Sequence, residues 1–274
     1  MLSVNTNSGA LVALQYLNKT QSELATAQTA LNTGLKVASA KDDGATYAIA
    51  QNMRGNVAGY GSVMDSLNRG MSAVDVAMSA GQSISDLLVQ MKEKALSAAD
   101  AALDTASRQA LNQDFAALRD QISTITKNAV FNNFNLIDGS TTKITALASS
   151  DGSRHITVGA ENLTLSGTIV TIKSTNTIST QARASSMIGV IQASLSNVNS
   201  ALAKLSAGSK KFSIQLDFTQ KLSDTLTTGI GHMVDADMAE ESARLTALQT
   251  KQQLGIQALA IANQAPQSIL SLFQ

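Results

Sequence analysis

A single proline, Pro266, occurs in the 274 residues of this chain. An average chain of this length carries about fourteen prolines. Because proline breaks or kinks a helix, this scarcity indicates long uninterrupted helices. Hydrophobic residues make up 44% of the sequence but aromatic residues only 3%, so a core must be built from Leu, Ile, Val, Met and Ala. The predicted fold class is therefore mainly α.

Three stretches place apolar residues in steps of three and four, which puts one narrow stripe on one side of a helix. The first covers residues 49–78 and resumes in a shifted register after Gly81, at residues 84–95. The second covers residues 111–129, with Asp104 before it as the predicted N-cap, and the third covers residues 191–216. Since no such stripe can be buried alone, we expect an elongated helical bundle or coiled coil.

Residues 130–180 differ in character because they are rich in Thr, Ser, Gly and Asn. Asp138-Gly139 and Asp151-Gly152 are turn dipeptides. Short β-branched runs flank them at residues 144–147, 155–158 and 169–172. This pattern predicts a small β-hairpin insert between helices.

Both ends of the chain are nearly free of charge. Residues 1–40 contain only Lys19, Glu23 and Lys36 as charged side chains, and the last thirty residues contain only Lys251. A solvated helix normally carries charge on its outer face, so a helix that is apolar on one side and uncharged on the other suits contact on most sides. Such a helix is marginal alone in water. We therefore expect both ends to become ordered chiefly against other copies, with inert disordered tails as the alternative.

The apolar positions of these ends are the candidate assembly residues of an inner helical layer. They are Leu14, Leu17, Leu24, Leu31, Leu35, Leu245, Leu248, Leu259, Ile269, Leu270 and Leu272.

Charge and composition argue against several classes of function. Twenty basic and twenty acidic residues give a formal net charge of zero, so there is no electrostatic case for nucleic acid or an anionic membrane as a partner. The absence of cysteine excludes disulfides and cysteine metal sites. Residues 1–9 show no signal-peptide pattern, and no run of eighteen apolar residues predicts a transmembrane helix. These features alone are typical of a soluble cytosolic protein.

No catalytic or cofactor-binding constellation is present in the sequence, so we expect no enzyme activity, cofactor or metal site. His155 falls in the β-like insert and His232 in an expected Gly-flanked turn, with nothing to bring the two together. Asp42 and Asp43 form a carboxylate pair for which helix capping is a better explanation than cation binding. Four acidic residues at an expected helix start match the helix dipole without a metal. They are Asp235, Asp237, Glu240 and Glu241.

Five segments of the chain resemble bacterial flagellins. Residues 31–43, L-N-T-G-L-K-V-A-S-A-K-D-D, and residues 262–273, A-N-Q-A-P-Q-S-I-L-S-L-F, resemble family motifs near the two ends. The opening residues 3–7, the stretch 66–72, and D-A-D-M-A-E-E at residues 235–241 are similar to further family elements. The occurrence of both end motifs in order makes this resemblance specific.

The resemblance implies a structural subunit that self-assembles into the flagellar filament. It implies an inner terminal coiled-coil domain of residues 1–44 and 235–274, joined at a spoke or turn containing Asp42 and Asp43. It implies an outer helical domain of residues 45–234 that includes the variable insert 130–180. The short insert is similar to that of alphaproteobacterial flagellins.

The resemblance also implies partners and a location. The expected partners are other flagellin copies, sister flagellins, the flagellar type III export apparatus, and cap and hook-associated proteins. The expected location is the extracellular filament, reached without a cleavable signal peptide. Outward-facing threonines of the insert are candidates for O-linked glycans, namely Thr164, Thr168, Thr171, Thr175 and Thr177.

Two alternatives remain open at this point. A hook–filament junction protein shares similar termini but is a minor component of the flagellum. A cytosolic coiled-coil adaptor belongs to another class and predicts charged residues beside its seams, which are sparse here.

Overall fold

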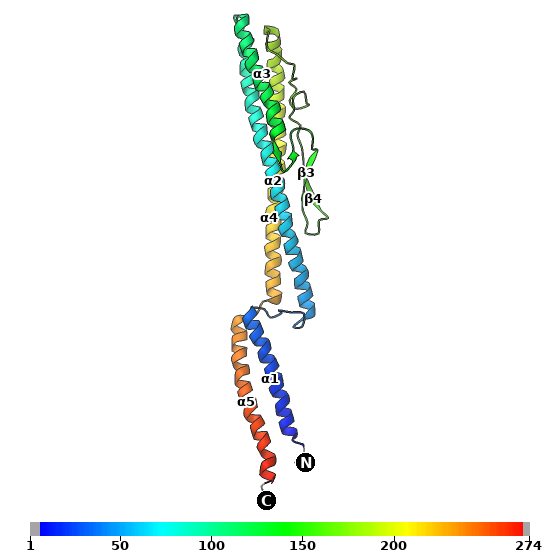
Figure 1. Ribbon diagram of the computed structural model, residues 1–274, viewed down its shortest axis with the longest axis vertical. Coiled ribbons are helices and arrows are strands. Elements are labelled where there is room, and N and C mark those ends of the chain that lie inside the picture. The colour runs from blue at the N-terminus through cyan, green and yellow to red at the C-terminus, as the bar shows by residue number, and fades with distance from the viewer. Residues whose placement is uncertain (1–5, 271–274) are drawn as a thin grey trace. The chain divides into compact units, whose positions relative to one another are not determined.

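The computed structural model describes the backbone of residues 6–270 and the side chains of residues 6–264. These residues are mainly helical with a small β insert, which confirms the predicted fold class (Figure 1). The elements are α1 Ser8–Thr33, α2 Gly44–Ala98, α3 Thr105–Asn128, β1 Val130–Phe131, β2 Phe134–Asn135, β3 Lys143–Leu147, β4 His155–Gly159, α4 Gln181–Val234 and α5 Met238–Leu270.

The chain divides into two compact units. Unit 1 comprises Met1–Gly55 and Thr225–Gln274, and unit 2 comprises Asn56–Asp224. The long helices α2 and α4 each contribute residues to both units. The division into an inner domain of residues 1–44 and 235–274 and an outer domain remains a proposal about the assembled protein.

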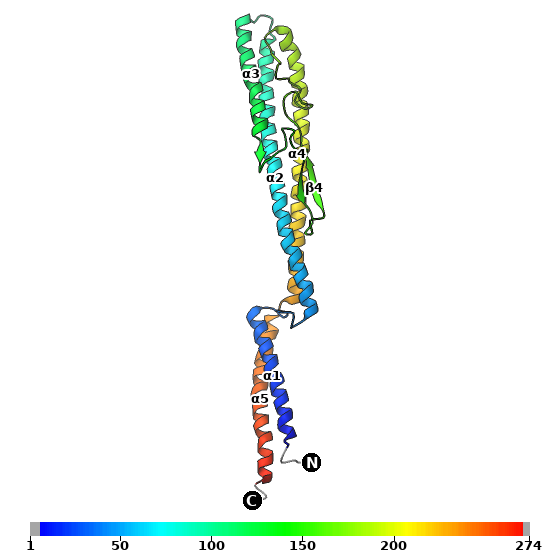
Figure 2. The ribbon, with the colours of Figure 1, turned by 45° about the vertical axis from the view of Figure 1, so that its right-hand side comes forward.

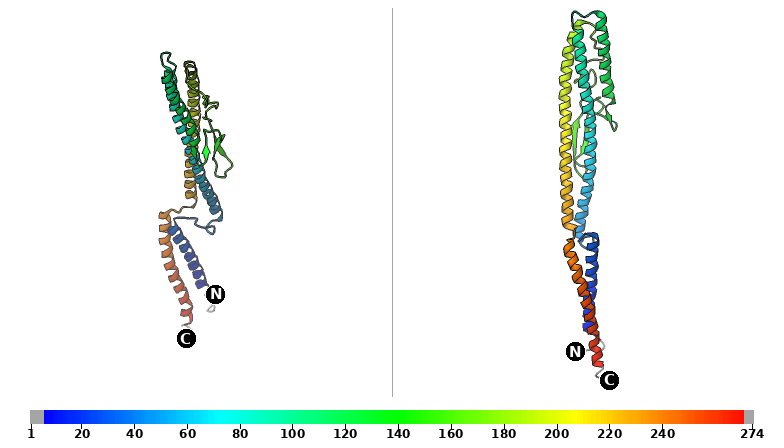
Figure 3. Two further views of the ribbon diagram at one scale, coloured as in Figure 1. Left: turned by 45° about the horizontal axis from the view of Figure 1, so that its top comes forward. Right: turned by 90° about the vertical axis from the view of Figure 1, so that its left-hand side faces the viewer.

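In unit 1, α1 and α5 run antiparallel and side by side (Figure 3). Before the first turn of α1, the side-chain Nδ2 of Asn7 donates to the carbonyl of Ala262 at 2.7 Å. Further along, the side chain of Leu17 lies against Gly255, where an added Cβ would lie 3.4 Å from Leu17 Cδ1. The two ends of the sequence, each with regularly spaced leucines, therefore pair as two helices.

Short backbone contacts join the C-terminal end of α1 to the α4–α5 connection within unit 1. Gly34 ends α1 in the left-handed conformation (φ +71°), and its N–H donates to the carbonyl of Ala30 at 2.8 Å. The N–H of Lys36 donates to the carbonyl of Val234 at 2.7 Å, and that of Ala236 donates to Gly34 at 2.9 Å. These hydrogen bonds hold the end of α1 against the end of α4 and the residue Ala236 that follows it.

In unit 2, α3 lies along the parts of α2 and α4 that belong to this unit (Figure 2). Asp104 Oδ1 accepts a hydrogen bond from the N–H of Ser107 at 2.9 Å, which confirms the predicted N-cap of α3. The guanidinium of Arg108 donates through Nε to the carbonyl of Ala98 at 2.8 Å. Arg108 thereby satisfies a free carbonyl at the C-terminal end of α2 and ties α2 to α3.

The predicted stripes supply most of the helical core of unit 2. Fully buried members are Leu67, Val74, Ile84, Leu88, Met91, Phe115, Ile122, Ile191, Val198, Leu205 and Phe212. The structure therefore confirms the predicted bundle, because the predicted stripes face its core.

Glycines of α2 lie at contacts with side chains of α4 in unit 2. Met64, Met71 and Met78 are only half-buried, whereas Gly70 and Gly81 are buried. A Cβ at Gly81 would lie 2.7 Å from Leu202 Cδ2, so Leu202 would have to shift to admit a side chain there. The methionines therefore flank this contact as adaptable filling.

The insert contains two strand pairs. β3 pairs antiparallel with β4, which confirms the predicted hairpin, and the glycines of both turn dipeptides have positive φ. β1 and β2 form a second, very short hairpin that the sequence did not predict. Its turn residues, Asn132 and Asn133, both have positive φ, as a two-residue hairpin turn requires. The predicted strand at residues 169–172 is wrong, because this segment pairs with no strand in the described part of the chain.

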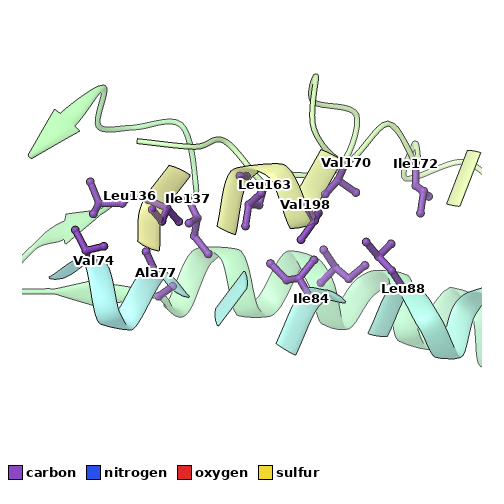
Figure 4. Packing of buried hydrophobic residues seen from close by; sticks show 14 of the residues in the cluster. Val74, Ala77, Ile84, Leu88, Leu136, Ile137, Leu163, Val170, Ile172 and Val198 are labelled. Atoms are coloured by element: carbon purple, nitrogen blue, oxygen red, sulfur yellow. The ribbon is translucent and has the colours of Figure 1, made fainter. Parts of the chain in front are cut away.

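The β-branched residues of that segment are buried anchors. Val170 and Ile172 are fully buried, and Figure 4 shows them with Leu163 beside Ile84 and Val198 of the helices. The insert therefore closes the core over α2 and α4. These apolar residues are buried without forming a third strand, so their β-branched composition alone led to the wrong prediction of a strand.

Candidate assembly surfaces

Most of the predicted assembly leucines lie along the α1–α5 pair. Leu248 is 6% exposed and thus buried, while Leu14 is 43% exposed. The half-buried members are Leu17, Leu24, Leu31, Leu35, Leu245 and Leu259. Since Leu17 packs against Gly255 of the same chain, much of this set stabilises the helix pair itself. Leu272 and the side chains of Ile269 and Leu270 lie outside the described residues.

A second set of apolar side chains points away from the α1–α5 pair. On α1, Leu11 is 54%, Val12 51% and Tyr16 65% exposed. On α5, Leu254 is 59% and Ile261 69% exposed. Exposed apolar side chains gathered in this way mark interaction sites.

On α5 these residues form an outer seam in steps of four and three. The outer seam consists of the exposed residues Ala247, Lys251, Leu254, Ala258 and Ile261. Its heptad spacing is that of a coiled-coil face, yet no helix covers it within the described residues of this chain. The spacing of the outer seam can be read in the sequence, but the neighbouring leucine stripe on α5 gives the stronger apolar pattern.

Threonines help to make the uncharged faces of α1 suitable for burial. The hydroxyls of Thr20, Thr26, Thr29 and Thr33 each donate to the carbonyl four residues earlier, at 2.8–3.1 Å. A hydroxyl satisfied inside its own helix does not need water as a partner. These polar positions can therefore enter an interface at low desolvation cost.

Asp42 and Asp43 organise the turn between α1 and α2. Asp42 Oδ2 accepts hydrogen bonds from the N–H groups of Ala38 at 3.1 Å and Ser39 at 2.8 Å. Asp43 Oδ1 accepts from the N–H groups of Ala45 and Thr46 at 3.0 and 3.1 Å, which caps the first turn of α2. The Thr46 hydroxyl donates to Asp43 Oδ2 at 2.6 Å, and this bond holds the pKa of Asp43 below its usual value.

Replacing Asp43 by alanine is expected to fray the start of α2. The lowered pKa means that the cap stabilises the folded state above the ordinary carboxyl pKa and is lost as the pH falls through the folded value. Amide hydrogen exchange of Ala45 and Thr46 should therefore be faster in Asp43→Ala at pH 7. In the wild type, their protection relative to Asp43→Ala should vanish in acid. Equal exchange in both proteins at pH 7 would contradict this role.

The remaining acidic residues and the histidines lie at helix ends and in the insert. Asp237 Oδ1 accepts from the N–H of Ala239 at 2.9 Å and so caps α5. His232 lies in the last turn of α4, so the expected Gly-flanked turn is wrong, because the helix runs through Gly229 and Gly231 just before it. His155 is exposed on β4. No cluster of three potential metal-ligating side chains occurs among residues 6–270, and none of the helices described there is long and apolar enough to cross a membrane.

The candidate threonines of the insert differ in accessibility. Thr168, Thr171 and Thr175 are exposed, although the Thr171 hydroxyl lies 3.1 Å from Ser194 Oγ. Thr164 and Thr177 are half-buried, and the Thr164 hydroxyl donates to Asn162 Oδ1 at 2.6 Å. Thr168 and Thr175 are therefore the most accessible of the five.

The geometry of these helices indicates a general class of protein. A helix pair with few charges, unmatched apolar faces and no catalytic centre in its described residues is typical of a subunit that associates with other copies. Comparison with known proteins identifies the family. Residues 4–142 match the bacterial flagellin N-terminal helical region, and residues 188–273 match the bacterial flagellin C-terminal helical region. This chain belongs to the bacterial flagellin family, whose members are structural, non-enzymatic subunits of the flagellar filament outside the cell.

Individual relatives agree with this assignment. Flagellin FljK of Caulobacter vibrioides is 53% identical over 272 residues, which cover 99% of this chain and 98% of that protein. Flagellin FljM of the same organism is 52% identical over the same shares of both chains. A solved structure described as a flagellar hook-associated protein from Vibrio parahaemolyticus covers 71% of this chain and 100% of its own, with a TM-score of 0.59 and 12% identity. That similarity concerns the fold alone.

Proposed function

We propose that this flagellin polymerises chiefly through the outward faces of α1 and α5, so that unit 1 forms an inner coiled-coil layer of the filament. The outer seam carries the proposal, because Leu254 and Ile261 are more than half exposed on a helix that holds one charge, Lys251, from residue 245 onward. Completing the burial of each such side chain contributes roughly 1–2 kcal/mol. Contacts repeated on both helices supply the favourable free energy of polymerisation.

The predicted leucines take part in this assembly in two ways. Leu248 and Leu17 hold α1 on α5, so that the pair presents a defined surface. Leu14, on the exposed side of α1, contributes directly to contacts with other copies. Asp42 and Asp43 set the geometry of the connection to α2 by fixing its backbone turn.

Further partners follow from family membership. Two flagellins of one organism, FljK and FljM, match this chain almost equally well, which supports copolymerisation with sister flagellins. We propose export through the flagellar type III apparatus without a cleaved signal peptide, and contacts with the cap and hook-associated proteins at the filament ends. O-linked glycans on the exposed insert threonines belong to the same proposal, and an intact mass equal to the sequence mass would exclude them.

The alternatives receive less support. A junction protein is less consistent with 53% identity to a flagellin over almost the whole chain. A cytosolic adaptor is less consistent with two flagellin family matches and with outer faces poor in charge.

Deletion of residues 245–274 tests the function. The truncated chain should keep the thermal unfolding transition of unit 2, because that unit contains none of the deleted residues. It should form no sedimentable filaments under conditions in which the full chain does, because the outer seam and the partner of α1 are gone. Normal filaments from the truncated chain would contradict the proposal.

A further inference from the structure

A groove of about 330 Å³ on unit 2 is lined by α2, by the β1–β2 hairpin and by β3. A volume of this size admits a small ligand or a few residues of a peptide. None of the lining residues is acidic. The lining includes two cations, two aromatic rings, a glycine and a threonine, namely Arg69, Lys143, Phe131, Phe134, Gly70 and Thr145.

The hydrogen-bond ladder of the β3–β4 hairpin shows which backbone groups of β3 are free. Opposite residues of an antiparallel pair alternate between hydrogen-bonded and non-hydrogen-bonded. Thr142 and Ala160, just outside the paired strands, are hydrogen-bonded, since the N–H of Ala160 donates to the carbonyl of Thr142 at 3.0 Å. Counted along the ladder from there, the backbone N–H and carbonyl groups of Lys143, Thr145 and Leu147 point away from β4.

This free edge of β3 faces the groove. The N–H of Leu147 donates to Ser66 Oγ at 3.1 Å, and Ser66 lines the groove on α2. Thr145 lies two residues earlier on the same edge and also lines the groove. Its outward N–H and carbonyl have no hydrogen-bond partner among residues 6–270. The groove therefore contains an unpaired strand edge, beside which one further strand can lie.

The side chains around this edge favour one kind of strand. Arg69 and Lys143 are exposed and form no ion pair within the described part of the chain. Phe134 is 48% exposed and Phe131 is half-buried, so both rings offer apolar area to a ligand. A lysine on a strand edge discourages pairing with an ordinary uncharged strand. An acidic strand meets opposite charges there instead.

We propose that this groove binds an extended acidic peptide segment of a partner protein as an additional strand beside β3. The backbone of the segment pairs with Thr145, and its carboxylates lie near Arg69 and Lys143. An apolar side chain of the segment packs on Phe131 and Phe134. Main-chain hydrogen bonds supply affinity in this mode of recognition, and alternate side chains supply specificity. The site needs no polymerisation, so it adds a binding function to that of a filament subunit.

Peptide binding to the full chain in its monomeric form tests the proposal. The probe is a fluorescein-labelled peptide in which glutamate alternates with valine around one central phenylalanine. Fluorescence anisotropy should show saturable binding, and a probe with lysine at each glutamate position should bind at least about tenfold more weakly. Reversing both cations, as Arg69→Glu with Lys143→Glu, should exchange the preference between the two probes. No saturable binding of the acidic probe to the wild type, or an unchanged preference in this variant, would overturn the proposal.

Two matched proline variants separate strand addition from charge attraction alone. Thr145 and Thr157 lie opposite each other in the β3–β4 register, and each directs its N–H outward on its own edge. Proline removes that N–H. Thr145→Pro should weaken binding of the acidic probe at least about tenfold, whereas Thr157→Pro, on the edge that does not line the groove, should leave binding unchanged. Equal effects of the two substitutions would contradict strand addition.

A second copy of this chain is the other occupant to be tested. Normal filaments from the variant with both cations reversed, together with its lost binding of the acidic probe, would support a partner other than flagellin itself. Lost polymerisation with unchanged binding of the probe would assign the groove to a second copy and would overturn the proposal. The truncation of residues 245–274 tests the proposed function separately, because it leaves this groove intact.

Discussion

Replacing both Leu254 and Ile261 by glutamate is expected to abolish filament formation while leaving the chain folded. Both side chains are more than half exposed in the free subunit, so its folding should change little. In the filament, each new carboxylate would be buried without a partner, which costs several kcal/mol per copy. A cost of about 4 kcal/mol corresponds to a rise of roughly a thousandfold in the critical concentration. Sedimentation and electron microscopy measure the filaments, and circular dichroism measures the fold.

Two control variants separate lost contact area from an introduced charge. Leu254→Ala with Ile261→Ala removes apolar area only and should raise the critical concentration without abolishing polymerisation. Glutamates at Ser174 and Thr175, exposed in the insert, should have little effect. Filaments of normal length and number from the double glutamate variant would show that the outer seam is not an assembly surface.

Replacing Phe212 by alanine is expected to give the largest loss of stability in unit 2. Phe212 is fully buried, and its ring packs against Gly70, where a Cβ would lie 3.2 Å from Cε2. Removing a buried phenylalanine leaves a cavity and lowers the free energy of unfolding by about 3–5 kcal/mol. Urea unfolding followed by circular dichroism measures this change.

Phe218 provides the matched control on the same helix. Phe218→Ala should lower the free energy of unfolding by less than about 1.5 kcal/mol, because the side chain is 57% exposed. Equal destabilisation by the two substitutions would contradict the packing of α4 described above.

The helical part of the fold was predictable because its signals are periodic and local. The stripe containing Phe115 and Ile122 and the cap at Asp104 identified α3 from sequence alone. The β3–β4 hairpin followed from Asp151-Gly152 in its turn, where Gly152 has positive φ. In contrast, Asn132 and Asn133 form the β1–β2 turn without a glycine, so the usual hairpin signal was missing.

Tertiary packing decided the features that were not predictable. Val170 and Ile172 are β-branched, as strand residues often are, but they are buried against the helices as anchors of the insert. The predicted leucine set of the termini was identified by spacing alone, which does not say whether a stripe faces its own chain or another. Leu248 faces inward while Leu254, on the same helix, faces outward, and only the paired helices distinguish them.

The central claim is that the outer faces of α1 and α5 are covered by other copies in the filament. A high-resolution electron cryomicroscopy reconstruction of filaments grown from the purified chain tests it most directly. The account predicts that Leu254 and Ile261 are buried against a neighbouring subunit. Filaments in which both side chains remain exposed to solvent would contradict it.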